Sequence, residues 1–255
     1  MPLPTNLTAL VLAAGLGTRL GKLTQHTPKA LAPIADTSLL AFNLNRLKNV
    51  GISKVIVNVH HYAEQITEYL KKHDHFGLEI QISDERKQLM DTGGGILQAL
   101  PLVEANHHLL VHNVDIISNF PLSELVRAHL ASRAAATLLV RNRKSSRKLY
   151  FNQQMQLTAW EHLEQKNKKI IAGADLSASK PLAFGGIHVI NPEYFRNLPV
   201  EPCSIIDLYL QLAPHEKIMG HQDHADVWLD VGKPDQLKKA SHRIRQSAFW
   251  NEPGL

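Results

Sequence analysis

Apolar and polar positions alternate between two periods along the first half of the chain. Short apolar runs, typical of buried strands, are separated by segments in which apolar residues recur every three or four positions, typical of amphipathic helices. The predicted strands cover residues 7–13, 54–59, 79–83, 108–111 and 136–140, and the predicted helices cover 39–49, 63–72, 95–100 and 122–132. This alternation predicts right-handed βαβ crossovers and a mostly parallel sheet whose ligands bind at the carboxyl ends of the strands.

The pattern changes between residues 147 and 171, where short strands joined by polar turns predict an antiparallel β insertion. The α/β pattern then resumes, with strands predicted at 182–190, near 217–220 and at 227–230, and helices at 191–195, 205–213 and 234–245. Residues 250–255 are predicted to be a loose tail. We therefore predict one α/β domain over residues 1–255, with a core formed by 1–140 and 180–245 and an insertion at about 145–175.

Charge and composition narrow the class of ligand. The chain has 255 residues, of which 44% are apolar, and a formal net charge of +5. The basic residues are spread along the chain except for the run at 141–148, and only 6% of residues are aromatic, so a nucleic-acid surface is not expected. The fifteen histidines do not repeat at the spacings of zinc ligands. A pocket for a small polyanion fits this composition better.

The cysteine content and the apolar runs predict a cytoplasmic protein. Cys203 is the only cysteine in the sequence and cannot form an internal disulfide, which favours a reducing compartment. The apolar run at 10–14 has no basic segment before it and is too short to span a bilayer, so it is interpreted as a strand. No membrane association is expected.

The loop after the first predicted strand holds the candidate chemistry. Its sequence from residue 10 is LVLAAGLGTRLGKLTQHTPKAL, with glycines at 15 and 17 that permit a tight turn and a close approach to a ligand. Leu20 stands where a dinucleotide-binding loop needs a third glycine, and GKLT does not complete a Walker loop. The loop nevertheless carries Arg19 and Lys29, two cations suited to phosphate oxygens, and is interpreted as a polyphosphate site.

The chain resembles the sugar-1-phosphate nucleotidyltransferases. The pattern Leu-Ala-Ala-Gly-x-Gly-Thr-Arg-Leu, followed about ten residues later by Pro-Lys, is similar to the signature of this family. The segments TGGGI (92–96), VHNVD (111–115), FGGIHVI (184–190) and WLDVGKPDQL (228–237) follow in the order that the family uses. The chain looks most like short bacterial members, such as N-acetylmuramate-1-phosphate uridylyltransferases and mannose-1-phosphate guanylyltransferase-like proteins, which lack a C-terminal β-helix.

The resemblance implies a fold, a reaction and a set of site residues. The fold is a Rossmann-like three-layer sandwich with a mostly parallel mixed sheet, and the reaction transfers a nucleotidyl group from a nucleoside triphosphate to a sugar 1-phosphate, releasing pyrophosphate. By resemblance, Arg19 holds the leaving pyrophosphate, Lys29 stabilises the α-phosphate, and Asp115 and Asp230 bind Mg²⁺. The remaining implied residues are Leu12, Ala13, Ala14, Gly15, Gly17, Thr18, Thr92, Gly93 and Gly94 for the nucleotide, and Asn113 and Gly186 for the sugar.

Two alternatives remain open at this point. Val114 stands where the family has glycine, which favours a catalytically weak nucleotide-sugar-binding or regulatory homologue. An NAD-dependent oxidoreductase is disfavoured by Leu20 and by Asn58, where an acidic residue would be expected. Lys180 is a candidate for the sugar phosphate, but its segment is not clearly equivalent to the family's Glu-Lys-Pro. The base, the sugar and the oligomeric state are not fixed by the sequence.

Overall fold

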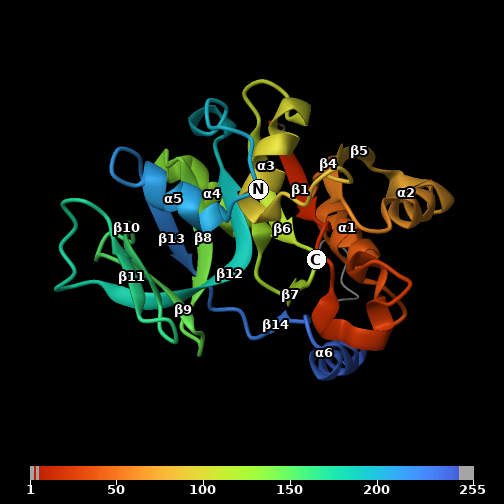
Figure 1. Cartoon of the computed structure of the whole chain (residues 1–255). Coiled ribbons are helices and arrows are strands. Elements are labelled where there is room, and N and C mark those ends of the chain that lie inside the picture. Colours follow the sequence, from red (N-terminus) through yellow and green to blue (C-terminus); the bar gives the residue numbers. More distant parts are fainter. Residues whose placement is uncertain (1–2, 4–5, 247–255) are drawn as a thin grey trace.

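A ten-stranded mixed sheet runs through the protein (Figure 1). The computed structural model describes residue 3 and residues 6–246. The strand order is β11-β10-β9-β12-β6-β1-β4-β5, and β8 pairs with β12 and β13. The strands are β1 (Leu7–Leu12), β4 (Lys54–Val59), β5 (Glu79–Asp84), β6 (His108–Asn113), β8 (Ala136–Arg141), β9 (Arg147–Phe151), β10 (Leu157–His162), β11 (Asn167–Ile170), β12 (Lys180–Ile190) and β13 (Ile218–Gln222).

Helices cover both faces of the sheet because its central strands are apolar on both sides. In β1, Ala9 and Val11 face one core while Leu10 faces the other, as the period of two requires. The first core is completed by α1 (Leu39–Asn49), α2 (Ala63–Lys72), α4 (Leu122–Ser132) and α6 (Pro234–Gln246), and the second by α3 (Asp91–Ala99) and α5 (Ile205–Leu212). The result is a three-layer α/β/α arrangement.

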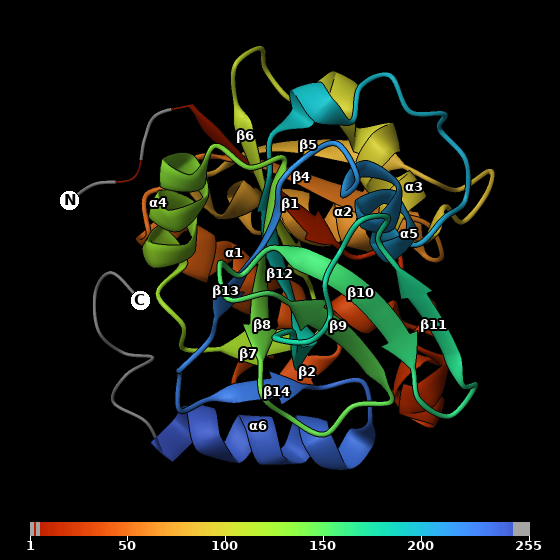
Figure 2. The same ribbon diagram turned by 90° about the vertical axis from the view of Figure 1, so that its left-hand side faces the viewer.

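Strand β12 joins the parallel part of the sheet to the antiparallel insertion. Residues 180–182 pair with β9, whereas residues 187–190 pair with β6, all antiparallel. The register against β8 shifts between Phe184 and His188, and Gly186 in this shift has a φ of 78°, a conformation that favours glycine. Strands β9, β10 and β11 form a curved sheet at one end of the molecule (Figure 1), which faces the viewer in Figure 2.

A short antiparallel pair closes the structure beneath the carboxyl end of β6. Strand β7 (Ile116–Ser118) pairs with β14 (Trp228–Asp230), and α6 follows β14 directly. Figure 2 shows α6 lying along β14 at the bottom of the view. Strand β2 (Pro33–Ile34) and strand β3 (Thr37–Ser38) form a second small pair beside α1.

The predicted elements are largely confirmed. Helices 39–49, 63–72 and 122–132 and strand 54–59 have the predicted bounds, and the insertion at 147–171 is antiparallel. The segment 191–195 contains a single 3₁₀ turn, η5 (Pro192–Tyr194). The predicted tail at 250–255 lies outside the described residues.

One predicted boundary is wrong, at the glycine run before α3. The helix begins at Asp91 rather than Gly95, so the residues of TGGG before the predicted start are helical as well. Three consecutive glycines disfavour a helix in isolation, but here they allow close packing against the segment before α5. A Cβ at Gly93 or Gly94 would lie within 3 Å of backbone atoms of residues 201–204. Tertiary packing therefore overrides the local preference.

Three buried histidines make the fold sensitive to acid. Burial is the main cause that lowers the pKa of His112, His129 and His188 to about 3 in each case. His112 accepts from Arg46 Nη1 at 3.1 Å, whereas both ring nitrogens of His188 are buried and have no partner among the described residues. Within the described part of the chain, no helix combines the length and apolarity needed to cross a membrane.

We expect the free energy of unfolding to fall as the pH decreases from 6.5 towards 3. In this range the unfolded chain binds protons at these imidazoles and the native chain does not, so each histidine removes about 1.4 kcal/mol per pH unit. Urea denaturation between pH 7 and pH 4 should show a shallower slope for His188→Leu than for the wild type. Equal slopes would contradict the prediction, and the exposed His215, changed to Leu, is the control.

Candidate active site

The loop after β1 is held by a buried asparagine at the end of the neighbouring strand. Asn58 in β4 is 2% exposed, and its side-chain Oδ1 accepts from the backbone N–H groups of Ala13 and Ala14 at 2.5 and 3.2 Å. Because β1 and β4 are parallel neighbours, their carboxyl ends meet at one edge of the sheet. The Asn58 amide thus fixes the chain at the point where β1 becomes loop.

Glu85 extends this contact to α3. Asn58 Nδ2 donates to Glu85 Oε1 at 2.6 Å, and Glu85 Oε2 accepts from the backbone N–H of Met90 at 3.1 Å. Burial raises the pKa of the Glu85 carboxyl, while the hydrogen bonds from Asn58 and Met90 oppose this rise. A Cβ at Gly95 would lie 2.6 Å from Oε1, so α3 can approach only with glycine there. The loop, β4, β5 and α3 are joined by one polar network.

This network underlies a cavity of about 200 Å³, which we call the loop cavity. Its lining includes seven of the predicted site residues together with Asn58, Glu85, Leu89, Asp91 and Val114. The seven are Leu12, Ala14, Gly15, Lys29, Thr92, Asn113 and Asp115. Asn58 and Glu85 were not predicted as site residues, because the hydrogen bonds that define their role join segments far apart in sequence.

Lys29 and Asp115 form an ion pair at one end of the loop cavity. Lys29 opens the 3₁₀ turn η2 (Lys29–Leu31) after Pro28 and is 8% exposed. Gly17, with a φ of 67°, lets the loop pack closely against Lys29. A Cβ at residue 17 would lie only 2.8 Å from the Cβ of Lys29. A nearly buried ammonium beside a carboxylate is positioned for anionic ligands and cations together.

The β7–β14 pair brings the second aspartate to the first. Asp230 pairs with Ile116, the residue after Asp115, and the Val231 N–H donates to the Asp115 carbonyl oxygen at 2.9 Å. Arg19, in the 3₁₀ segment η1 (Thr18–Thr24), lies beside Asp230, where Gly232 leaves room for the guanidinium. The four charged side chains predicted from the sequence therefore converge.

Arg19 and Asp230 line a second, larger cavity of about 710 Å³, the insertion cavity. Its other walls come from β9, β10, the loop before β9 and the start of α5. Three arginines and two carboxylates line it, with Trp160, Leu149 and Phe184 supplying apolar surface; the charged residues are Arg19, Arg143, Arg147, Glu164 and Asp230. Asp115 lines the loop cavity and Asp230 lines the insertion cavity, and the pairing of β7 with β14 connects the segments that carry them.

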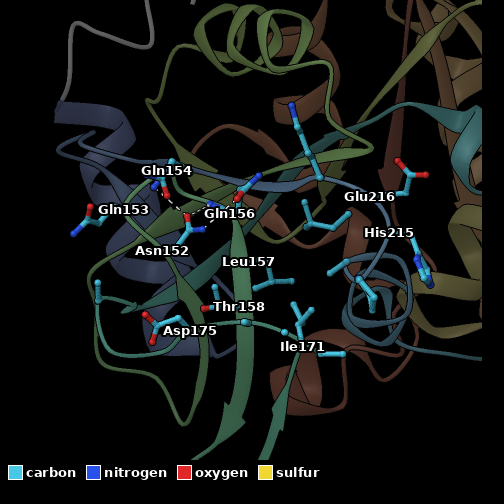
Figure 3. A pocket seen from close by; sticks show the side chains of 18 residues that line it. Asn152, Gln153, Gln154, Gln156, Leu157, Thr158, Ile171, Asp175, His215 and Glu216 are labelled. Carbon is cyan, nitrogen blue, oxygen red and sulfur yellow. Dashed lines mark hydrogen bonds between the residues drawn. The ribbon is translucent and has the colours of Figure 1, made fainter.

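A third cavity lies at the far end of the insertion (Figure 3). The labelled residues include a run of amide side chains, and Asn152 bonds to Gln156 across the turn between β9 and β10. None of the predicted site residues lines it. The candidate chemistry is therefore confined to the loop and insertion cavities.

Some predicted residues lie outside both cavities. The backbone N–H groups of Gly93 and Gly94 donate to the Cys203 carbonyl oxygen at 2.8 and 3.3 Å, so these glycines pack against another segment instead of lining the loop cavity. Gly186 sits behind Asn113, where a Cβ would lie 3.2 Å from Asn113 Nδ2. Thr18 is on the outer side of the loop, by His61, and Lys180 lies at the start of β12 beside Phe151.

The carboxylates of Asp115 and Asp230 suit a cation that is also bound by phosphate oxygens of a substrate. Among the described residues, no three acidic, histidine or cysteine side chains gather into a metal site. The segments that carry Asp115 and Asp230 are paired. Mg²⁺ in phosphate-transferring enzymes is commonly bound by one or two carboxylates plus phosphate oxygens, and the two aspartates fit this arrangement.

Comparisons with known proteins agree with this geometry. Residues 8–247 match the family model "Nucleotidyl transferase". The N-acetylmuramate alpha-1-phosphate uridylyltransferase of Caulobacter vibrioides is 30% identical, over 94% of this chain and 97% of that protein. The mannose-1-phosphate guanylyltransferase catalytic subunit beta of Drosophila pseudoobscura is 28% identical, over 97% of this chain and 67% of that protein. The crystal structure of HddC from Yersinia pseudotuberculosis complexed with GMP-PN has the same fold, with a TM-score of 0.73. The two sequences are 18% identical, and the match covers 93% of this chain and 99% of HddC.

Replacing Asn58 by Ala should loosen the loop. The change leaves two backbone N–H groups and one Glu85 oxygen without their partner, which should lower the free energy of unfolding by about 1–3 kcal/mol and speed amide hydrogen exchange at Ala13 and Ala14. Asn152→Ala is the matched control, since Asn152 also accepts from two backbone N–H groups but is only half-buried. Unchanged exchange at Ala13 and Ala14 would show that Asn58 does not hold the loop.

Proposed function

Because the chain belongs to the nucleotidyl transferase family, we propose that it transfers a nucleotidyl group from a nucleoside triphosphate to a sugar 1-phosphate and releases pyrophosphate. The observation that carries the proposal is that the β7–β14 pairing joins the Lys29–Asp115 ion pair to Asp230 and its neighbour Arg19. The loop cavity takes the nucleoside and the insertion cavity takes the sugar. The reacting phosphates meet between them.

The reaction is an in-line displacement that requires positioning and charge neutralisation rather than a covalent intermediate. The sugar phosphate oxygen attacks the α-phosphorus of the triphosphate, the bond from this phosphorus to the bridging oxygen breaks, and pyrophosphate leaves with the electron pair. Lys29 donates to the α-phosphate as negative charge develops there. Arg19, which lies beside Asp230, holds the departing pyrophosphate.

Mg²⁺ is the metal that we propose for this site. Asp115 and Asp230 would hold it, and when bound it would neutralise phosphate charge and orient the triphosphate. Lys29 contacts Asp115 in the structure, so this carboxylate orients the ammonium as well. Leu12, Ala14, Gly15, Thr92 and Asn113 form the walls against which the base and ribose lie.

We propose UTP as the donor. The Caulobacter relative, which this chain matches over 97% of its length, is a uridylyltransferase, whereas the chain spans only 67% of the guanylyltransferase subunit. The single cysteine fits the reducing cytoplasm, which is where nucleoside triphosphates are made.

A purely binding or regulatory role is not favoured. That alternative rested on Val114, but the Val114 side chain is 4% exposed and packs in the first hydrophobic core, while its backbone carbonyl oxygen accepts from Asn43 Nδ2 at 2.9 Å. The valine therefore leaves the charged groups in place. The oxidoreductase alternative fails because Asn58 is bonded to the loop backbone and to Glu85.

A pyrophosphate-release assay tests the proposed function. The chain is incubated with UTP, GTP, CTP or dTTP, with and without Mg²⁺, and with N-acetylmuramate, N-acetylglucosamine or mannose 1-phosphate. We expect release with UTP that depends on Mg²⁺ and on a sugar 1-phosphate. Nucleotide binding without release in any combination would favour the regulatory alternative.

Changing Lys29 to Ala should lower kcat about 10²- to 10³-fold, because it removes a preorganised donor to the transition state. The dissociation constant of the nucleotide should change much less, since the contact strengthens only as the α-phosphate reacts. Steady-state kinetics and nucleotide titration measure the two effects, and retained binding shows that the variant is folded. Lys22→Ala, an exposed lysine of the same loop, is the control. Equal losses in kcat and in binding would make Lys29 a binding residue only.

A further inference from the structure

Each candidate metal ligand lies beside a cation of this chain. Lys29 forms an ion pair with Asp115, and the two side chains are only 11% and 17% exposed. Asp230 and Arg19 lie around Gly232, where a Cβ would be 2.8 Å from Arg19 Nη2 and 3.0 Å from Asp230 Oδ1. Neither carboxylate is therefore free of a neighbouring positive charge.

A third cation acts on the second carboxylate. The Arg143 guanidinium lies 4.4 Å from the centre of the Trp228 ring, and it interacts electrostatically with Asp230, two residues further along β14. Three cations thus accompany two carboxylates, and these five groups carry a net charge of +1. Such a group attracts a polyanion and repels a free divalent cation.

The other carboxylates of the loop cavity have partners of their own. Glu85 accepts from Asn58 Nδ2 at 2.6 Å and from the Met90 N–H at 3.1 Å. Asp91 Oδ1 accepts from the Thr92 N–H at 2.6 Å. The pair of carboxylates described above therefore remains the place for a metal.

The loop around Lys29 holds its side chain towards Asp115. Gly17 packs against the Lys29 Cβ, and the Gly17 carbonyl oxygen accepts from Thr24 Oγ1 at 2.9 Å, which fixes this part of the loop. Among the described residues, Asp115 provides the only acceptor found for the Lys29 ammonium. Because an unpaired, nearly buried cation is costly, Lys29 leaves Asp115 only when another anion replaces the carboxylate.

A nucleoside triphosphate supplies that anion. Lys29 and Asp115 both line the loop cavity, in which we place the nucleoside. Phosphate oxygens accept strong hydrogen bonds from an ammonium, so the α-phosphate takes over Lys29 and leaves the Asp115 carboxylate to a metal. Mg²⁺ is commonly bound by one or two carboxylates together with phosphate oxygens, and the nucleotide brings those oxygens at the same time.

We propose that Lys29 keeps free divalent cations from Asp115 until a nucleoside triphosphate binds, so that the metal enters together with the nucleotide. This inference rests on the proposed function and adds the order in which its ligands bind. By linkage, metal and nucleotide strengthen each other's binding by the same factor. Without nucleotide, metal binding is weak because Lys29 occupies Asp115.

The probe for the test is Mn²⁺, which takes the same kinds of oxygen ligands as Mg²⁺. It is titrated by calorimetry, without nucleotide, into the wild type and into Lys29→Met, which keeps an unbranched stem beside Gly17 but lacks the charge. We expect the dissociation constant of Mn²⁺ to be at least about ten-fold lower in Lys29→Met. Lys29→Arg, which keeps a cation beside Asp115, should bind Mn²⁺ no more tightly than the wild type. The exposed Lys22, changed to Met, is the control in the same loop and should have no effect.

Two further titrations locate the metal and include the nucleotide. Adding Asp115→Asn to Lys29→Met should return the dissociation constant of Mn²⁺ to about the wild-type value. At a saturating concentration of the α,β-methylene analogue of UTP, the wild type should bind Mn²⁺ at least about ten-fold more tightly than without it. Because phosphate oxygens add ligands in both proteins, the gain in affinity is compared between them, and it should be smaller in Lys29→Met.

The outcomes separate this inference from the proposed function. Equal or weaker Mn²⁺ binding by Lys29→Met without nucleotide would overturn the inference, as would tighter binding that persists with Asp115→Asn. A wild type that binds Mn²⁺ equally well with and without the saturating analogue would also overturn it, and this measurement needs no variant.

Pyrophosphate release by the wild type, combined with an unchanged metal affinity in Lys29→Met, would keep the proposed function and reject the inference. A gain in metal affinity in Lys29→Met, without pyrophosphate release by the wild type in any combination, would reject the proposed function and support the role of Lys29 beside Asp115. A cooperative urea transition shows that the variants are folded.

Discussion

The pairing of β14 with β7 is the constraint on which the site depends. The three residues of β14, which are far from β1 in sequence, pair with β7, the strand that follows β6. The Val231 N–H then donates to the carbonyl oxygen of Asp115. This backbone contact sets the separation of the two aspartates. Without it, the segment that carries Asp230 would not be joined to the one that carries Asp115.

Electrostatics explains why hydrogen bonds and ion pairs surround the charged residues of the site. Two cations and two carboxylates in a partly buried edge are stable only while each charge keeps a partner, because unpaired buried charges are strongly destabilising. Lys29 meets Asp115, and Asp230 accepts from the Gly232 N–H at 3.0 Å. The Asn58–Glu85 network stabilises the uncharged loop in a similar way, because Asn58 accepts from the backbone N–H groups of Ala13 and Ala14. A rigid loop and paired charges together provide the preorganisation that phosphate transfer needs.

Local patterns predicted the elements well and the long-range contacts poorly. Periodicity alone placed α1, α2, α4 and β4, because each buries one regular face or run. It failed at α3, where three glycines are helical because residues 201–204 press against them. The four charged site residues were reached through motif resemblance and do converge in space. Asn58 and Glu85 were missed, since their roles arise from partners 27 to 45 residues away, and a single sequence does not encode such pairs visibly.

The division between the two cavities follows from the different origins of their walls. The loop cavity is built on parallel strands, whose aligned carboxyl ends and connecting loops are fixed by the sheet, so its shape is tied to the fold itself. The insertion cavity is built largely on β9 and β10, an antiparallel pair that joins the sheet through the first residues of β12 and through a bridge from Gln156 to Met219 in β13. The exposed side chains of this wall, Arg147 and Glu164, can vary without disturbing the core, whereas the buried Leu149 belongs to the second core. The antiparallel wall can therefore change its exposed chemistry while the parallel edge that holds the loop after β1 keeps its shape.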